Sequence, residues 1–256
     1  MLAKRPISAV VITKNEALTI RQCVMALQAV ADEVLVYDSF SDDGTVEICK
    51  SLGVNFQQGE WQGYAATKNH ADRLAKHDWI LSIDADEILS PQLQTALREA
   101  DLSDLGQVYE LQRRVFYCGK RVRWGSWNPD WKPRLFNRQT AHWVGEYVHE
   151  TLQYTREVKL VRLTGVCEHY TVQSVAQHHA QIEKFAVLKA RQMYANGKTH
   201  SLLKPFSKAA WEFIKGYFLK LGFLDGWLGF QIARRNAYAK WLRYQKLKDL
   251  LLEDRE

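Results

Sequence analysis

Short β-branched runs alternate with amphipathic stretches through the first hundred residues, and this alternation constrains the fold more than any other feature. Four runs, residues 7–12, 33–37, 54–56 and 79–83, are predicted strands, and the stretches between them, residues 17–30, 45–52 and 64–76, are predicted helices. A further helix is expected from Pro91 to about residue 100, because Ser90 is a good N-cap. Strands that alternate with helices pair mostly in parallel. We therefore predict an α/β fold with a mostly parallel sheet and helices on both faces.

The pattern changes near residue 105. Residues 107–117 predict a long strand, and residues 134–136 and 158–163 predict further strands. Helical periodicity begins at about residue 172, so we expect a first domain at residues 1–171, with halves at 1–104 and 105–171, and a helical extension at residues 172–256. The first helix of the extension is expected to end at Gly197 and to share one apolar face among Val175, His179, Ile182, Phe185, Ala186 and Leu188. In the first helix of the chain, the apolar side is assigned to Leu18, Val24, Met25 and Leu27.

Composition excludes several classes of protein. The formal net charge is +6 and the sequence pI is about 9.0, which favours an anionic partner such as a nucleotide, a phosphorylated glycan, acidic lipid or nucleic acid. The four cysteines form no CxxC pair, so neither a zinc site nor a disulfide framework is indicated and a reducing cytosol fits best. No signal-peptide core and no charge-free run of about 18 apolar residues is present, so we expect a soluble or peripheral protein.

The last part of the chain is basic and aromatic together. Between residues 198 and 248, eleven lysines and arginines face only Glu212 and Asp225, with aromatic residues interleaved. This pattern is typical of a helix pair on an anionic membrane surface, and equally of a helical subdomain that packs through its aromatics and leaves a basic face in water. Nucleic-acid binding is a third interpretation of the same tail, although we expect no nucleic-acid partner.

Polar clusters follow the predicted strands, where ligands collect in open α/β sheets. Thr13, Asn15 and Glu16 come directly after the first strand, where they suit contacts to a base or ribose, or simply a capped loop. Asp38 ends the second strand and is favoured as a ligand contact, whereas Asp43 is favoured as a helix cap.

Two further clusters suit a diphosphate and its counter-ion. A glycine-containing loop at residues 59–63 opens a helix, and Lys68, one turn in, can reach a phosphate, although a solvent-facing lysine is the alternative. The buried run at residues 79–83 ends in Asp84-Ala85-Asp86-Glu87. Residues two apart in a strand point the same way, so both aspartates are expected to face one Mg²⁺ or Mn²⁺ ion, or else to form a merely polar strand end.

These clusters together resemble the family 2 glycosyltransferases, which are inverting enzymes with the GT-A fold, a Rossmann-like nucleotide-diphospho-sugar transferase fold. The matching segments are residues 11–16 (VITKNE), 38–45 (DSFSDDGT), 63–69 (GYAATKN) and 84–87 (DADE). The resemblance implies that Thr13, Glu16 and Asp38 line the nucleoside pocket. It also implies that Lys68 lies near the diphosphate or ribose and that Asp86 holds the metal.

Downstream segments extend the resemblance over nearly the whole chain. Residues 133–138 (PRLFNR) and 145–150 (GEYVHE) are similar to a bacterial subgroup of the family. Residues 222–229 (GFLDGWLG) look like the tail of the lipopolysaccharide inner-core glucosyltransferases that act on heptose. The resemblance makes residues 1–104 the nucleotide-sugar half and residues 105–171 the acceptor half.

The residue that activates the acceptor is less evident. Inverting transfer requires a base near the acceptor hydroxyl. Many family members take it from a Glu-Asp pair downstream of the metal motif, and no such pair occurs between Asp86 and Leu250. We choose Glu150 as base and His149 as a metal or diphosphate contact, against the alternative of a hydrogen-bonded structural pair. Arg134 suits a diphosphate or an acceptor phosphate. Structural roles are expected for His169, His178 and His179.

The sequence therefore predicts a metal-dependent hexosyltransferase that moves glucose from UDP-glucose to a heptose of a lipid-linked lipopolysaccharide inner core. Its nucleotide-sugar contacts include Asn15 and Asp84 besides the residues above. It is expected in the cytoplasm, peripheral on the inner membrane, where an anionic membrane surface is a candidate partner. Two alternatives stay open: a family 2 transferase with another acceptor, such as another glycan, a peptide or a polymer, and a non-catalytic nucleotide-sugar or glycan-binding module.

Overall fold

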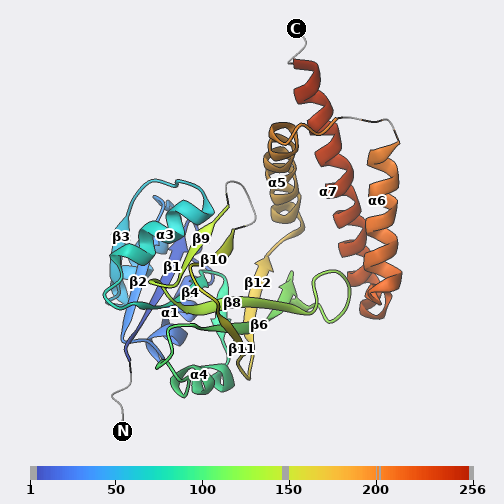
Figure 1. Ribbon diagram of the computed structural model, residues 1–256. Helices are drawn as coiled ribbons and strands as arrows, with labels where there is room; N and C mark the ends of the chain where they lie inside the picture. Colours follow the sequence, from blue (N-terminus) through green and yellow to red (C-terminus); the bar gives the residue numbers. More distant parts are fainter. Residues whose placement is uncertain (1–4, 146–149, 200, 202, 254–256) are drawn as a thin grey trace. The chain divides into compact units, whose positions relative to one another are not determined.

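A computed structural model describes residues 5–145, 150–199, 201 and 203–253 of the chain (Figure 1). The chain divides into two compact units. Unit 1 holds the residues up to 114 together with residues 130–170, and unit 2 holds residues 115–129 together with the residues from 171 onward. The excursion at residues 115–129 thus belongs with the C-terminal helices. The division into functional domains at residues 171 and 172 stays a prediction.

The sheet of unit 1 begins as a parallel α/β sheet. In the described part of the chain it has ten strands in the order β3-β2-β1-β4-β8-β6-β12-β5, with β7 and β11 paired to β6. Its parallel strands are β1 (Ile7–Thr13), β2 (Glu33–Asp38), β3 (Asn55–Gln58) and β4 (Trp79–Asp84). All residues of β1 and β2 are buried, as expected for parallel strands covered on both faces. The predicted α/β fold is confirmed.

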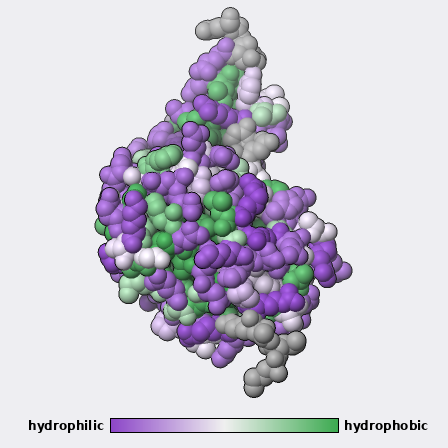
Figure 2. All heavy atoms as spheres, turned by 90° about the vertical axis from the view of Figure 1, so that its left-hand side faces the viewer, coloured by the Kyte–Doolittle hydropathy of each residue, from purple (hydrophilic) through white to green (hydrophobic). Residues whose placement is uncertain are grey.

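Two apolar cores cover the two faces of this sheet. One holds α1 (Ile20–Gln28), α2 (Thr45–Ser51) and α4 (Pro91–Arg98), whose buried side chains include Leu27 and Leu93. The other holds α3 (Tyr64–Leu74) with the hairpin of β9 (Ala141–Val144) and β10 (Thr151–Tyr154). Seen from the side of α3 and β3, hydrophilic residues dominate the surface of unit 1, with hydrophobic residues grouped between them (Figure 2).

Antiparallel strands extend the sheet beyond β4. They include β6 (Gln107–Tyr117), which has its predicted bounds, and β8 (Asp130–Asn137), which contains the predicted residues 134–136. The predicted strand at residues 158–163 is β11 (Lys159–Arg162), parallel to β6. The sequence pattern missed β5 (Glu87–Leu89), β9, β10 and β12 (Cys167–Val172), because these short segments mix apolar with polar residues and none contains an apolar run of more than two residues.

Unit 2 is a helical assembly. It contains α5 (Val175–Ala195), α6 (Lys204–Ile214) and α7 (Gly226–Glu253), and both α5 and α6 pack against α7 (Figure 1). A π-helical turn, Lys215–Leu219, and a 3₁₀ turn, Gly222–Asp225, join α6 to α7. The two-residue strand β7 (Lys120–Arg121) pairs with the end of β6. The predicted C-terminal helical extension is confirmed.

Two predicted helix faces are wrong in part. In α5 the buried residues are His178, Ile182, Ala186 and Ala190, whereas Val175 and Phe185 are exposed. The buried stripe is narrower than the apolar pattern, because only the side of α5 that packs against α7 is covered. Leu18, which precedes α1, and Met25 within it are exposed. The buried stripe of α1 runs through Cys23, Val24 and Leu27.

No helix in the described part of the chain is long and apolar enough to cross a membrane.

Candidate active site

The carboxyl ends of β1, β2 and β4 meet at one edge of the sheet. Thr13 at the end of β1 is paired in register with Asp38 at the end of β2, and Ile12 is paired with Asp84 at the end of β4. Ligands of open α/β sheets bind at this edge. The sheet therefore brings three of the four predicted polar clusters together, and α3 adds the fourth through Lys68.

The acidic turn separates its two aspartates. We expected both carboxylates to face one cation because they were placed on one strand, but β4 ends at Asp84 and residues 85 and 86 form a turn. Asp84 is bound by Lys68, whose Nζ lies 3.0 Å from Oδ1, and by Arg134, whose Nη2 lies 2.5 Å from Oδ2. Asp86 instead places Oδ2 at 3.1 Å from Nε2 of His169. The two carboxylates thus hold different partners.

Lys68 is the central cation of the site. Its residue is 1% exposed, so the alternative of a solvent-facing lysine is wrong. The ammonium lies 3.0 Å from Asp84 and 3.0 Å from Oε1 of Glu150, and 4.6 Å from the centroid of the Trp143 ring. A desolvated ammonium needs such compensation, because burial without a partner is costly. Lys68 therefore connects the acidic turn to the residue that we chose as base.

A chain of ion pairs continues from Asp84 to β6. Arg134 on β8 is buried and also contacts Oε1 of Glu87 at 2.5 Å, and the same oxygen lies 3.1 Å from Nη1 of Arg113. Arg113 in turn binds Asp130. Burial opposes ionisation of Asp84, but Arg134 and Lys68 hold the pKa of its carboxyl well below its usual range. Asp84 is thus held as an anion, and Asp84 and Glu87 together orient the arginines.

The predicted nucleoside contacts are held by the loop after β2. Asp38 is buried and accepts hydrogen bonds from the backbone N–H of Ser41 and from Nε2 of Gln58, both at 2.9 Å. Asn15 adopts φ 59° and accepts from the backbone N–H of Asp42 at 3.0 Å. In the described residues, Oγ1 of Thr13 is buried and has no hydrogen-bond partner. A buried hydroxyl without a partner is uncommon, and a bound ligand is one way to satisfy it.

Asp43 contacts the start of α2, although the N-cap residue is Gly44 and not Asp43 as we predicted. It accepts from the backbone N–H and from Oγ1 of Thr45, the first residue of α2, and also from the backbone N–H of Ala17. Asp43 therefore ties the loop after β1 to the start of α2.

Carboxylates outnumber cations around the acidic turn. Burial, together with the nearby charge of Asp86, raises the pKa of Glu16 to about 7. Asp86 has one oxygen turned to His169 and a second that can bind an ion. An oxygen ligand in a field of excess negative charge fits Mg²⁺ or Mn²⁺, which take few protein carboxylates when a diphosphate supplies further oxygens. Among the described residues, no three His, Cys, Asp or Glu side chains form a metal cluster by themselves.

Glu150 lies at this site, whereas His149 lies outside the described residues. Sequence reasoning missed four residues of the site: Glu87, Arg113, Trp143 and His169. We expected a structural role for His169, but its Nε2 faces the predicted metal ligand. Glu87 was visible as a neighbour of the acidic turn. The other three are far from it in sequence and are brought close by tertiary contacts. His169 comes through the pairing of β12 with β5, Arg113 through the pairing of β6 with β8, and Trp143 through the packing of β9 on α3.

The fold and this edge define an α/β protein with a ligand site at the carboxyl ends of its parallel strands, where β4 delivers the carboxylates and α3 delivers the buried cation. The model of glycosyl transferase family 2 matches residues 8–157, which is more than half of the chain. The chain belongs to glycosyl transferase family 2, as the sequence motifs predicted.

Several relatives share most of their length with this chain. An uncharacterised glycosyltransferase of Rickettsia bellii is 31% identical, over 98% of this chain and 89% of the relative. The lipopolysaccharide core biosynthesis glycosyltransferase LpsC of Rhizobium meliloti is 28% identical, over 96% of this chain and 93% of the relative. A crystal structure of glucosyl-3-phosphoglycerate synthase from Mycobacterium tuberculosis with Mn²⁺, UDP and glucosyl-3-phosphoglycerate has a TM-score of 0.46 at 17% identity. The match covers 78% of this chain and 82% of that structure's chain.

Proposed function

We propose that this family 2 glycosyltransferase is a metal-dependent, inverting enzyme that moves glucose from UDP-glucose to a heptose of a lipid-linked lipopolysaccharide inner core. One observation carries the proposal: at the carboxyl edge of the parallel strands, Lys68 joins Asp84 at the end of β4 to Glu150, and Asp86 follows Asp84 in the next turn. That edge combines a candidate metal ligand, a buried cation and a candidate base.

The roles follow from the chemistry of each side chain. Asp86, beside His169, is the proposed ligand of Mg²⁺ or Mn²⁺, which when bound neutralises charge on the departing UDP. Glu150 removes the proton of the acceptor hydroxyl as its oxygen bonds to the anomeric carbon, while the bond from that carbon to the diphosphate breaks and UDP leaves with the electron pair. Lys68 orients Glu150 through their ion pair, and Arg134 orients Asp84.

The nucleoside is assigned to the edge formed by β1 and β2. The free hydroxyl of Thr13 and the carboxylates of Glu16 and Asp38 are the proposed contacts to the base and ribose, with Asn15 shaping the loop. Asp38 exchanges part of its present bonding to Ser41 or Gln58 for ligand hydroxyls when the donor binds.

The acceptor is assigned from the relatives. The Rhizobium meliloti relative is a glycosyltransferase of lipopolysaccharide core biosynthesis, and its match covers nearly all of both chains. The segment at residues 222–229 supports a heptose acceptor. A lipid-linked acceptor implies work at the cytoplasmic face of the inner membrane, with the protein peripheral to it.

Release of UDP tests this function directly. The purified chain is given several nucleotide sugars, each with truncated lipopolysaccharide that ends in heptose, with and without Mn²⁺. We expect UDP release that requires UDP-glucose, the acceptor and the metal, and product analysis by NMR should show an inverted anomeric centre. Release with a different acceptor only would replace the proposed acceptor, and UDP binding without any release would favour the non-catalytic module.

Substitution of Asp86 tests the metal site. Asp86→Asn keeps the shape but loses the charge, so we expect UDP release to fall about a hundredfold, because the ion contributes several kcal/mol of transition-state stabilisation. Asp101→Asn is the matched control, since Asp101 lies at an exposed turn and accepts from the backbone N–H and the side-chain hydroxyl of Ser103. Wild-type turnover by Asp86→Asn in the presence of metal would contradict the proposed role.

A further inference from the structure

Helix α6 turns its apolar side outward. The structure describes every residue of α6, and among them only Pro205 is buried. Phe206 is 65% exposed and Trp211 is 53% exposed, and Ile214 is also exposed. At about 100° per residue these three side chains lie within one sector of about 140°. An apolar sector in water is the reverse of what a surface helix normally shows.

Lysines follow one border of this sector. Lys204, Lys208 and Lys215 lie four and seven residues apart, which places them on one line along the helix. Within the described residues no carboxylate pairs with any of the three, whereas Glu212 on the inner side binds Lys240 of α7. The helix thus has an inner face, an outer apolar face and a basic border between them.

The turn beyond α6 continues the apolar sector. Phe218 and Leu219 in the π-helical turn are exposed, and Trp227 at the start of α7 is 71% exposed. We call Phe206, Trp211, Ile214, Phe218, Leu219 and Trp227 the apolar edge. Several large exposed apolar side chains within one short segment of the chain indicate a binding surface.

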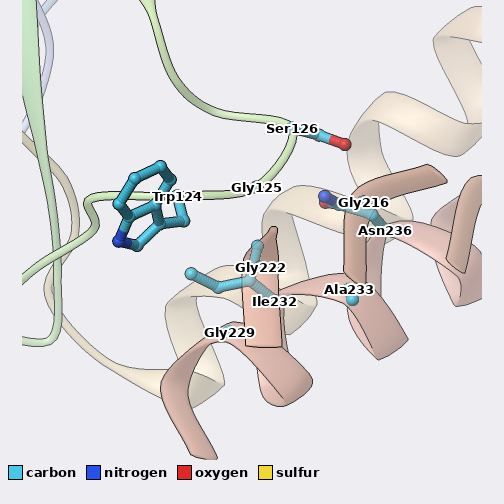
Figure 3. A pocket seen from close by; sticks show the side chains of 9 residues that line it. All are labelled: Trp124, Gly125, Ser126, Gly216, Gly222, Gly229, Ile232, Ala233 and Asn236. Atoms are coloured by element: carbon cyan, nitrogen blue, oxygen red, sulfur yellow. The ribbon is translucent and has the colours of Figure 1, made fainter. Parts of the chain in front are cut away.

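The turn is rigidly built. Asp225 accepts from the backbone N–H groups of Arg123 and Trp124 at 2.8 and 2.9 Å, and the N–H of Gly125 donates to the carbonyl of Lys220 at 2.9 Å. Gly216, Gly222 and Gly229 face the loop of Trp124, Gly125 and Ser126 across a narrow hollow (Figure 3). A Cβ on Gly229 would lie 1.8 Å from the carbonyl oxygen of Gly222, so only glycine permits this packing. The turn that carries Phe218, Leu219 and Trp227 is therefore fixed by hydrogen bonds and close packing.

We propose that the apolar edge inserts into the headgroup region of an anionic lipid bilayer, with the basic border of α6 bound to lipid phosphates. Unpaired lysines beside exposed tryptophans complement a surface that is anionic outside and apolar beneath, which is the chemistry of such a bilayer. Membrane binding has only the location of the acceptor in common with the proposed transferase function. Binding to vesicles is measured without a nucleotide sugar or an acceptor.

Vesicle binding tests this proposal. The full chain is mixed with vesicles of phosphatidylcholine alone, or with about one third phosphatidylglycerol, and binding is measured by flotation and by tryptophan emission. We expect binding to the anionic vesicles at least tenfold tighter than to neutral ones, weakened by salt, with a blue shift of the emission.

Paired variants separate the edge from the rest of the surface. Phe218→Ser is expected to weaken vesicle binding about tenfold, since it removes a large part of an aromatic side chain from the bilayer. Leu18→Ser is its control, because Leu18 in unit 1 is also exposed. Lys208→Glu is expected to weaken binding about tenfold or more, and Lys159→Glu on β11 is the control for the same change of charge. Circular dichroism and urea unfolding verify that each variant is folded.

Three outcomes would overturn the proposal: no binding to anionic vesicles, equal binding to both kinds, or equal effects of test and control variants. Self-association of the chain that is lost in Phe218→Ser, without vesicle binding, would instead assign the edge to a second copy. UDP release from a water-soluble acceptor fragment is expected to be unchanged in Phe218→Ser. Failure of the transferase assay with intact vesicle binding would therefore overturn the proposed function alone.

Discussion

The environment of Lys68 in the structure differs from the one that its sequence position suggests. From sequence it is a lysine one turn into a helix, for which solvent exposure is the ordinary expectation. In the structure it is buried between Asp84 and Glu150 and lies against the Trp143 ring. Breaking a buried ion pair from one side costs much more than the pair contributes, because the remaining charge stays desolvated. The site is therefore sensitive to the loss of a single charged side chain such as Lys68.

Removing the ammonium is expected to destabilise unit 1. Lys68→Met keeps the length of the side chain but leaves Glu150 without this buried partner, so we expect the free energy of unfolding to fall by about 3 kcal/mol. Urea unfolding followed by circular dichroism measures the change. The control is Lys76→Met at an exposed position, with an expected change within about 0.5 kcal/mol. Equal stability of the two variants would contradict the buried network.

At the scale of elements, glycines decide how the helices of unit 2 pack. Gly229 lies in the first turn of α7, where the carbonyl of Gly222 occupies the space of a side chain. Gly216 is less restricted, because a Cβ there would meet the movable hydroxyl of Ser126 at 3.0 Å. Alanine is a better helix former than glycine by up to about 1 kcal/mol, so any loss must come from packing.

Two alanine substitutions separate these effects. Gly229→Ala is expected to lower the free energy of unfolding by about 1–3 kcal/mol, because backbone must move. Gly216→Ala is expected to change it by less than about 1 kcal/mol, since Ser126 can rotate away and helix propensity offsets the crowding. Thermal unfolding followed by circular dichroism compares the two. A larger loss for Gly216→Ala than for Gly229→Ala would refute this account of the turn.

At the scale of the whole molecule, stability depends on pH through buried groups. His178 of α5 is buried, with its Nδ1 at 3.2 Å from the Tyr117 hydroxyl and its ring packed on Trp127. Burial, with the nearby charge of Arg235, lowers the pKa of His178 to about 4 from 6.5. The unfolded chain therefore binds a proton between pH 6.5 and 4 that the folded chain does not, so stability falls as the pH falls through this range.

We expect this effect to amount to about 2 kcal/mol between pH 7 and pH 4. His178→Gln removes the titrating group, so its free energy of unfolding should fall less steeply over that range than that of the wild type. The adjacent, exposed His179→Gln is the control and should keep the wild-type slope. Urea unfolding at a series of pH values supplies the slopes, and NMR titration of the His178 ring gives its pKa directly. A ring pKa near 6.5 would disprove the prediction.

Much of unit 1 follows from sequence because its information is local. The runs that form β1, β2 and β4 are long enough to show their burial, and their alternation with helices fixes the parallel pairing that lines up Thr13, Asp38 and Asp84. The family is visible for the same reason, since its motifs lie directly after these strands. Strands such as β9 and β12 mix apolar with polar residues and contain no continuous apolar run, and so the residues they deliver stayed unassigned.

By itself, the sequence determined the α/β class, the family and the edge of the sheet where a nucleotide sugar is proposed to bind. Only the tertiary structure decided that Asp84 is an anchor of ion pairs, that Asp86 faces His169, and that Lys68 reaches Glu150. It also decided that α6 turns its apolar side outward. The physical reason is the same in each case: strand and helix preferences act between near neighbours, whereas the partners of a buried charge and the exposed side of a helix depend on residues that are far apart in the chain.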